Sequence, residues 1–529
     1  MSKNVIIFSD GTGQAGGLRF DENRSNIYKL YRATRCGPDS AIDPHDQVAF
    51  YDPGLGSPED GENIKWRALR WLHNKVAQAT GFGITRNIID CYAALIQLWQ
   101  PGDRIYLFGF SRGAYTVRCL AGVIAFCGIP RHPRGQPDLP LKIDSDSAQK
   151  LAAYAVKHVY QFTYPRKFDD ATPYQKFLLE TRANVARRFR DECGSAGGPE
   201  AANVYPHFIG VFDTVASLGN AATTTLFGAA FLLLAAALGA FGEFLSLFGE
   251  APAIGWVLSY LTFWHVFIGT VTAAVVVAIG VYLFTHFKWD FRVPGYDLGS
   301  SLNTMHFNDL WMTFYDYDLN PNVGYARHTI SIDEDRANFK RVPWHSVKTT
   351  ARDTVGIQWF EQVWFSGVHA DVGGGYPENE SRLSDIPLDW MLRWASLIPG
   401  GLKHDPSVLK RWPYPEGPQH DEVRAGLGLI TTLTGLSWSK QNRLLPGADA
   451  VMHRSVYQRF DLAAAPIYDE MAPYRPETLR THTDFSLYYQ PGAAFPARSL
   501  QNATVVADDP AVIAEQLRQQ ASGPRPGCN

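Results

Sequence analysis

The 529-residue sequence lacks the residue patterns of several large classes of protein. Its six cysteines include no C-x-x-C pair, which argues against a zinc site or a disulfide framework and indicates reduced thiols. The histidines show no H-E-x-x-H or H-x-x-x-H pairing, so we expect neither a metal nor another cofactor. The net charge is only −3, which gives no general argument for nucleic-acid binding.

Internal repeats and coiled-coil heptads are also missing. The N-terminus enters an apolar strand-like run almost at once and shows no h-region of a secretory signal. Apolar residues make up 46% of the chain, which is enough to bury a large core. These features favour a large folded enzyme over a fibrous, disordered or disulfide-stapled protein.

Short apolar runs alternate with helix-like segments along much of the chain. The predicted strands are Val5–Phe8, Val48–Tyr51, Arg104–Phe108, His207–Phe212 and Glu361–Phe365. Residues 84–99 repeat apolar side chains every three to four positions, which predicts an amphipathic helix. Alternating strands and helices predict an α/β fold with a doubly wound, mainly parallel sheet, whose sites lie at the carboxyl ends of the strands.

Ser111 lies in Gly109-Phe-Ser-Arg-Gly113, directly after a predicted strand and directly before a helix-like stretch. A G-x-S-x-G string alone is weak, but this context is that of a nucleophile elbow, in which a sharp turn exposes the serine hydroxyl. The flanking glycines permit such a turn because side chains there would clash. The alternative is a structural tight turn. We expect Ser111 to be a nucleophile.

Asp213 and His369 each follow a predicted strand, and with Ser111 they give the chain order nucleophile, acid, base of α/β hydrolases. The imidazole would take the serine proton and the carboxylate would orient the imidazole. Asp213 could instead cap a turn, and His369 could be an ordinary core or surface histidine. Asp371 competes for the role of acid, but it is only two residues from His369 on a short loop, so we assign it a supporting role.

The oxyanion hole is expected to use the backbone N–H of Arg112, the residue after the nucleophile. A second donor would come from the loop after the first strand, at Gly11 or Thr12, with Asp10 in a supporting role. The same Asp-Gly-Thr-Gly run could cradle a phosphate, although it lacks the spacing and the lysine of a P-loop.

Residues 221–287 form a very apolar block. Residues 221–242 and 251–287 contain no charged side chain, and Glu243 and Glu250 lie between them. About 20 apolar residues cross the hydrocarbon layer as a helix, so the block predicts a transmembrane hairpin. Lys288 and Arg292 follow it, which favours a cytoplasmic catalytic domain. A pair of buried helices or a lipid-binding lid are the alternatives.

Several motifs together resemble one known family, the type VI secretion phospholipase-effector-like hydrolases of bacteria and fungi. The motifs are Phe8-Ser-Asp-Gly-Thr12, Gly109-Phe-Ser-Arg-Gly-Ala-Tyr115, Gly210-Val-Phe-Asp-Thr-Val-Ala-Ser217 and Trp364-Phe-Ser-Gly-Val-His-Ala-Asp-Val-Gly-Gly-Gly-Tyr376. The resemblance implies an α/β-hydrolase fold with a Ser-Asp-His triad, and some members cleave phospholipid acyl esters. The apolar insertion departs from a soluble effector and favours a resident membrane protein.

We therefore expect an α/β-hydrolase core in residues 1–219 and 290–500, interrupted by a hydrophobic hairpin at 220–289 and followed by a tail at 501–529. The expected function is a membrane-associated serine hydrolase, a phospholipase or lipase, whose partners are the membrane and a lipid or other acyl-ester substrate. The expected location is the inner membrane, with the catalytic domain cytoplasmic. A small-ester carboxylesterase, an acyltransferase and a non-catalytic membrane scaffold are the alternatives.

Overall fold

The computed structural model describes most of the chain. The described residues are 2–11, 23–54, 83–141, 144–163, 171–215, 221–247, 257, 260–290, 301–307, 317–344, 351–354, 356–426, 437–492 and 499–522. Thr12, Glu250 and Arg292, which the sequence analysis singled out, lie outside these residues, as do residues 523–529.

A six-stranded sheet forms the centre of the protein. Its strands are β1 (Asn4–Ser9), β2 (Gln47–Asp52), β3 (Arg104–Phe110), β4 (Phe208–Phe212), β7 (Tyr325–Ser331) and β8 (Phe360–Phe365). They are hydrogen-bonded in the order β2-β1-β3-β4-β7-β8, and every neighbouring pair is parallel. All six carboxyl ends therefore lie along one edge of the sheet, as the alternating pattern predicted.

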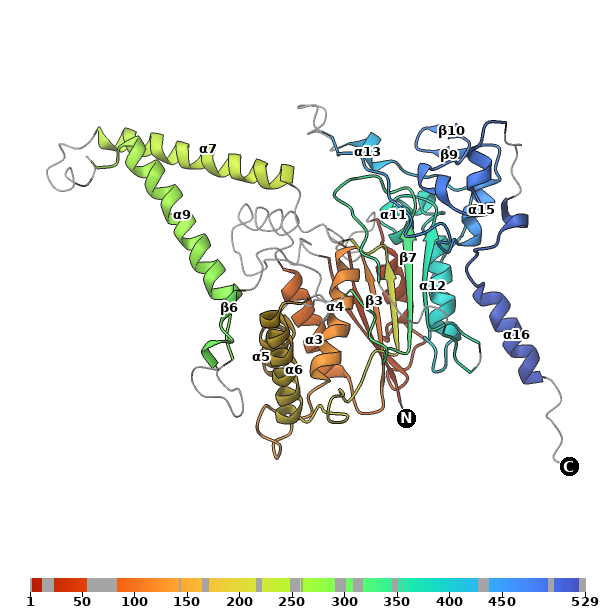
Figure 1. The fold of residues 1–529 in the computed structure, drawn as a ribbon, viewed down its shortest axis with the longest axis horizontal. Coiled ribbons are helices and arrows are strands. Elements are labelled where there is room, and N and C mark those ends of the chain that lie inside the picture. The colour runs from red at the N-terminus through yellow and green to blue at the C-terminus, as the bar shows by residue number, and fades with distance from the viewer. Residues whose placement is uncertain are drawn as a thin grey trace.

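The central strands are apolar on both faces because helices cover both. Val5 and Ile7 of β1 join one buried cluster, whereas Ile6 and Phe8 join the other. The first cluster contains side chains of α3 (Ile84–Leu98), α4 (Arg112–Cys127), α5 (Ser145–Tyr154) and α6 (Pro173–Cys193). The second contains side chains of α1 (Asn26–Thr34) and α12 (Asp385–Leu397). Figure 1 shows α3 to α6 on one side of the sheet and α12 on the other. This is a doubly wound α/β fold.

The chain after α12 covers the β8 edge of the sheet. Trp364 of β8 donates its N–H to Val451, and His453 donates to the Trp364 carbonyl, so this segment extends the sheet by one bridge. Its elements are α13 (Glu422–Ala425), α15 (Arg454–Phe460), β9 (Ala465–Ile467), β10 (Glu470–Ala472) and α16 (Pro510–Ser522). The segment assigned to a tail thus contains α16, and Ile513 of that helix packs against the second buried cluster.

Short helices complete the body. They are η1 (Ala155–Val159), η2 (Tyr160–Phe162), α11 (His369–Gly373), η4 (Glu378–Glu380), η5 (Glu477–Thr481), η6 (Ser486–Tyr489) and η7 (Ser499–Asn502). Of these, α11 follows β8 and begins at the expected base, His369. Five of the six strands were expected from the sequence, and β7 was not.

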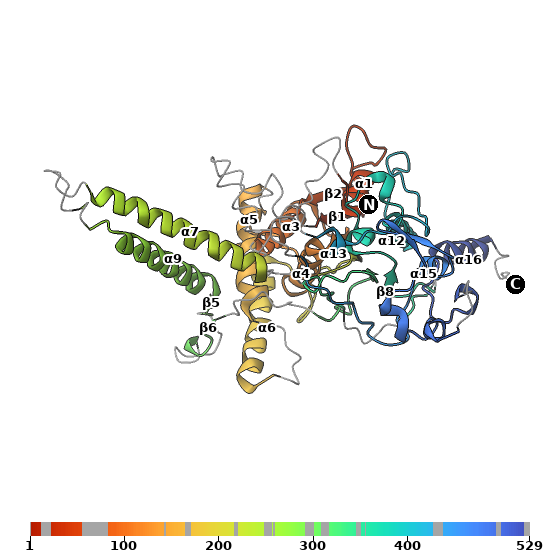
Figure 2. The ribbon, with the colours of Figure 1, turned by 90° about the horizontal axis from the view of Figure 1, so that it is seen from above.

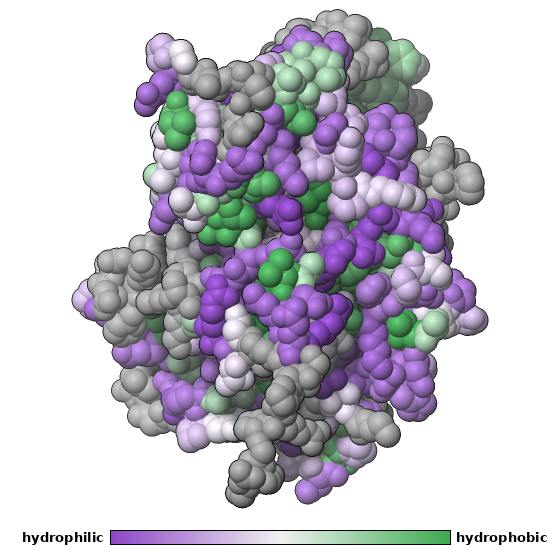
Figure 3. Space-filling view, turned by 90° about the vertical axis from the view of Figure 1, so that its right-hand side faces the viewer, coloured by the Kyte–Doolittle hydropathy of each residue, from purple (hydrophilic) through white to green (hydrophobic). Residues whose placement is uncertain are grey.

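Two long apolar helices, α7 (Ala221–Ser246) and α9 (Phe263–His286), form a hairpin that stands clear of the α/β body (Figures 1 and 2). Within the described residues, stretches 228–246 and 263–284 are long and apolar enough to cross a membrane, judged by length and composition only. Most of the exposed large hydrophobic side chains in the described chain lie on this hairpin. By contrast, the face of the body in Figure 3 is mostly hydrophilic with small separate apolar spots.

The hairpin is closed by specific contacts at its tip. Glu243 accepts the backbone N–H of Phe263 at 2.7 Å, so this charge caps the first turn of α9. A Cβ atom added to Gly242 would lie 2.5 Å from Val266, which shows how closely the two helices approach. Helix α7 continues to Ser246, so Glu243 lies within the helix and not in the connecting loop where it was expected.

The base of the hairpin is joined to the body. Strand β5 (Phe287–Lys288) pairs antiparallel with β6 (His306–Phe307), and Arg188 of α6 binds Asp290 at 2.9 Å. Lys288 is buried and donates to the carbonyl of Lys157 at 2.9 Å. Lys288 is one of the two basic residues on which the expected membrane topology rests. It is packed into the protein, where burial lowers its pKa to about 8.

The packing of the C-terminal segment gives a first prediction. Met452 is fully buried beside β8, whereas Met471 is 67% exposed on β10. Met452→Ala should lower the free energy of unfolding by about 2–5 kcal/mol, the usual cost of a methionine-sized cavity. The matched change Met471→Ala should stay within about 0.5 kcal/mol. Guanidinium denaturation in mild detergent measures both, and equal effects would contradict this packing.

Candidate active site

Ser111 occupies the turn between β3 and α4 in a conformation that few non-glycine residues adopt. Its φ is 56° and its ψ is −119°. Such backbone strain costs on the order of 1–3 kcal/mol and persists only where the surroundings enforce it. Here the Ser111 N–H donates to the Phe212 carbonyl at 3.0 Å, which ties the turn to the end of β4. The expected strand–turn–helix at the serine is present.

The two glycines of the motif are required by close packing. A Cβ atom on Gly109 would lie 2.4 Å from the Gly113 carbonyl oxygen, and one on Gly113 would lie 2.0 Å from the Ser9 carbonyl oxygen. Real Cβ atoms essentially never come so close to backbone. The start of α4 therefore lies directly against the end of β1, and this contact sets the direction of the turn that carries Ser111.

Asp213 directly follows β4 and has no exposed surface. Its Oδ1 accepts from the Ser331 N–H at 3.1 Å, and its Oδ2 accepts from the Ser331 hydroxyl at 3.1 Å. Arg443 donates to both oxygens, at 2.5 Å and 3.0 Å. Burial alone would raise the pKa of this carboxyl, but Arg443 and His369 outweigh it and hold the pKa well below its usual range.

His369 lies at the start of α11 with its ring aimed at Asp213. Its Nδ1 is 2.5 Å from Asp213 Oδ2, a short hydrogen bond between two buried side chains. The ring packs 4.7 Å from the Phe110 ring and 5.3 Å from the Phe339 ring, measured between centroids. Its Nε2 is buried and has no hydrogen-bond partner within the described residues. With Nδ1 bound to the acid, Nε2 is the nitrogen left for a proton transfer.

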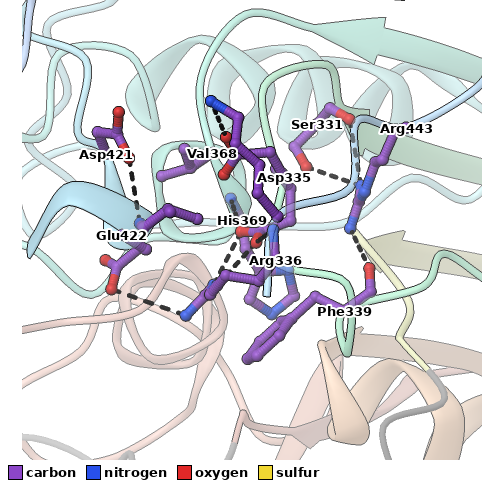
Figure 4. A network of polar contacts seen from close by, with 12 residues as sticks. Ser331, Asp335, Arg336, Phe339, Val368, His369, Asp421, Glu422 and Arg443 are labelled. Atoms are coloured by element: carbon purple, nitrogen blue, oxygen red, sulfur yellow. Dashed lines mark hydrogen bonds and ion pairs between the residues drawn. The ribbon is translucent and has the colours of Figure 1, made fainter. Parts of the chain in front are cut away.

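The backbone of His369 is fixed as well as its ring. Its N–H donates to Glu334 Oε2 at 3.1 Å, and Glu334 is itself held by Arg336 at 2.7 Å. Burial would raise the pKa of Glu334, but the Arg336 pair keeps it low, so Glu334 is an anion. Figure 4 shows Arg336 and Phe339 beside His369.

The expected oxyanion-hole residues differ in what surrounds them. Arg112 is the first residue of α4, and N–H groups at that position have no acceptor inside their own helix.

Gly11 lies against Phe110, but its N–H donates to Asp10 Oδ1 at 2.7 Å. Asp10 is buried and accepts from Ser25 at 2.5 Å and Tyr51 at 2.7 Å. It fixes the end of β1 to α1 and β2. Thr12, the other expected donor, lies outside the described residues.

Asp371 holds a second histidine and not the first. Its Oδ1 is 2.8 Å from His420 Nδ1, and its Oδ2 accepts the N–H of Val368, the residue that caps the start of α11. His420 Nε2 is 3.1 Å from Glu380, and the two carboxylates raise the pKa of His420 although burial opposes this. Asp371 thus holds the start of the helix that carries His369.

The residue that sequence reasoning missed is Arg443. It reaches Asp213 from a polar loop 230 positions further along the chain. It also donates to the carbonyls of Ser331 and Phe339, at 3.1 Å and 3.0 Å (Figure 4). No local motif marks it, because the loop around it reads only as a polar run. Arg443 can be identified only from the structure, where it is the cation that pairs with the buried carboxylate of Asp213.

Within the described part of the chain, no three His, Cys, Asp or Glu side chains lie close enough together to bind a metal ion. The five described cysteines are all free.

The parallel strand order and the strand–turn–helix at Ser111 define the α/β-hydrolase class of fold. Within that class the chain belongs to the family of type VI secretion system phospholipase effector Tle1-like catalytic domains, whose sequence profile matches residues 3–237 and 295–394. The resemblance seen in the motifs is thereby confirmed. The match is interrupted between 238 and 294, where the end of α7 and all of α9 lie.

Individual relatives are more distant. The uncharacterized protein YEL023C of Saccharomyces cerevisiae is 30% identical over 220 residues, which cover 41% of this chain and 27% of the yeast protein. An uncharacterized Pseudomonas aeruginosa crystal structure is 16% identical, covering 78% of this chain and 49% of its own, with a TM-score of 0.30. The Tle1 effector bound to the VgrG spike is 14% identical, covering 72% and 53%, with a TM-score of 0.25. The chain spans about a quarter to a half of these proteins.

The contact between α4 and β1 gives the prediction for this site. Gly113→Ala would force a methyl group against the Ser9 carbonyl, which should destabilise the fold by about 1–3 kcal/mol and displace Ser111. Any turnover that depends on Ser111 should therefore fall sharply. Gly198→Ala is the matched control, because its Cβ would meet only Ala201 at 3.8 Å. Full activity of Gly113→Ala would show that the turn does not depend on this contact.

Proposed function

We propose that the protein is a serine hydrolase that cleaves carboxylic acyl esters of phospholipids at a membrane surface. The observation that carries the proposal is the buried hydrogen bond between His369 and Asp213, together with an elbow turn that holds Ser111 at the end of the neighbouring strand β3. Membership of a phospholipase-effector family supports a lipid ester as the substrate. A scaffold without catalysis has no use for an oriented base, a buried acid and a strained serine at the same sheet edge.

In the proposed reaction the Ser111 hydroxyl oxygen attacks the carbonyl carbon of an acyl ester while its proton passes to His369 Nε2. Asp213 stabilises the imidazolium through Nδ1–H. The negative charge that develops on the carbonyl oxygen is stabilised by the Arg112 N–H and by a donor from the loop after β1, where Thr12 is our choice. His369 then protonates the departing alkoxide, so an alcohol such as a lysolipid leaves and an acyl-serine remains.

Water completes the cycle. His369 takes a proton from water, the hydroxide adds to the acyl carbon, and collapse returns the proton to Ser111 and releases a fatty acid. Each step uses only atoms of the ester, water and the three side chains.

The apolar hairpin supports a membrane as the place of action. In their described parts both helices carry exposed apolar side chains, including Leu233, Phe241, Ile268 and Phe284. A helix that lies on a surface needs a polar face, whereas one that is apolar all round is stable within lipid or protein. We propose that α7 and α9 cross the bilayer as a hairpin. Both flanks of the hairpin then lie on one side, which we assign to the cytoplasm on the basis of Arg292, the basic residue that follows Lys288 in the sequence.

The nucleophile gives the direct test of the proposed function. Ser111→Ala should lower the turnover of a chromogenic acyl ester and of phosphatidylcholine vesicles by on the order of 10⁶-fold. The fold should remain, since the hydroxyl lies at the turn. Ser195→Ala is the matched control: this serine is buried but bonds the Cys127 carbonyl, away from the proposed site. If Ser111→Ala retains its turnover, the proposed mechanism is wrong.

The hairpin gives a separate prediction. Because spanning helices are bound by the hydrophobic effect, the protein should leave membranes with detergent but not with high salt or alkaline carbonate. Leu247, 75% exposed at the hairpin tip, replaced by cysteine should react with an impermeant thiol reagent added outside the cytoplasm. Met471→Cys, exposed on the body, should react only after permeabilisation. Release by carbonate, or labelling of both positions from one side, would contradict a spanning hairpin.

A further inference from the structure

We propose that Arg443 is a positioning residue of the catalytic site, which keeps Asp213 ionised and directed at His369. This inference rests on the proposed triad and extends it. Arg443 lies outside the two segments that match the family of catalytic domains, which end at residue 394. The catalytic site of this chain would then be completed by its C-terminal segment.

The geometry leaves Asp213 little freedom. Arg443 bonds each carboxylate oxygen with a separate nitrogen, which fixes the plane of the carboxylate as a single-point contact would not. Ser331 donates to each oxygen as well, from its N–H and its hydroxyl. With His369, five donors meet a group that has about four lone-pair sites. The carboxylate cannot rotate away from Nδ1 without breaking several of these bonds.

The charge balance around Asp213 also depends on Arg443. A fully buried carboxylate without a cation tends to take up a proton, and a protonated acid is a poor acceptor for the Nδ1–H of His369. Other ionisable groups face this region. His328 of β7 is neutral because burial lowers its pKa to about 3. Arg341 interacts with Asp213 only through space, and Glu334 carries a negative charge. Arg443 is the cation in hydrogen-bond contact.

Arg443 also binds the carbonyls of Ser331 and Phe339, so a purely structural brace would use the same contacts. Three substitutions separate the two roles. Arg443→Lys keeps the charge but not the paired geometry. Arg443→Gln keeps donors but not the charge. Arg443→Met keeps neither and retains most of the side-chain length.

The experiment measures kcat and KM for a soluble chromogenic ester against pH in the full-length variants. Arg443→Gln should lower kcat by about 10- to 100-fold, the size of loss known for residues that orient a catalytic or metal-binding group, with KM little changed. Burial would then act on Asp213 without its counter-charge, so its pKa should rise. Activity should therefore fall on the acid side at higher pH than in the wild type.

Arg443→Lys should keep the wild-type acid limb with an intermediate kcat, and Arg443→Met should be the least active. Arg190→Gln is the matched control, because Arg190 is a buried arginine of α6 that bonds the Phe126 carbonyl. It should change the stability without moving the pH profile. If Arg443→Gln does not fold, Arg443→Lys carries the test through its kcat alone.

Two results would overturn the inference: an Arg443→Gln profile that coincides with the wild type or, where Arg443→Gln does not fold, a wild-type kcat in Arg443→Lys. Failure of the proposed function would look different. In that case Ser111→Ala would keep its turnover, whatever the Arg443 variants do.

Discussion

A carboxylate without exposed surface, that of Asp213, joins four parts of the chain that are far apart in the sequence. It directly follows β4, accepts two hydrogen bonds from the end of β7, binds the first residue of α11 and pairs with Arg443 from the C-terminal segment. Burying a charge is costly unless it is paired and fully hydrogen-bonded. The strand ends and loops around Asp213 are therefore constrained to keep these donors in place, and the orientation of His369 follows from that constraint.

The elbow at Ser111 depends on a second constraint, the close approach of α4 to β1. The Ser9 carbonyl leaves no room for a side chain at Gly113, so the chain turns sharply and the serine takes a positive φ. Asp213 also has a positive φ, of 38°. Strained backbone of this kind gathers at functional sites, because the surrounding fold must hold it. Two such residues at adjacent strand ends support our proposal that the site lies at the carboxyl edge of β3 and β4.

The apolar hairpin and the α/β body differ in the polarity of the surface that they expose. The body buries its large hydrophobic side chains in the sheet layers and presents a mostly hydrophilic face, whereas α7 and α9 expose theirs. Within the described residues of α7 and α9, Glu243 is the one Asp, Glu, Lys or Arg side chain, and its carboxylate accepts the N–H of Phe263 at the start of α9. Exposed apolar surface of this extent marks a place where another phase or molecule covers the protein.

Much of the fold could be predicted from the sequence, because it depends on local patterns. Val5–Phe8 and Ile105–Phe108 are apolar at successive positions, which predicts strands buried on both faces, and the turn at Ser111 follows from its glycines. Strand β7 was not predicted, since Arg327 and His328 interrupt its apolar pattern. In the structure both are fully buried, Arg327 paired with Glu361 at 3.1 Å.

The sequence is sufficient to propose the three residues of the candidate site but not the contacts that hold them. Ser111, Asp213 and His369 each follow a strand, so the parallel topology brings them to one edge. The bond from the Gly11 N–H to Asp10 and the pair between Arg443 and Asp213 depend on side-chain placement. No spacing along the chain encodes such contacts.

The most direct test of Ser111 as the nucleophile is the location of a covalent adduct. The full-length protein is treated with a lipid-like fluorophosphonate, digested and analysed by mass spectrometry, with and without competing phosphatidylcholine vesicles. A Ser111 nucleophile with His369 as its base should give a single adduct on the peptide that contains Ser111, at a rate that the vesicles reduce and that His369→Ala lowers strongly. A protein that hydrolyses phospholipid but carries its adduct on another serine, or carries none, would contradict the account.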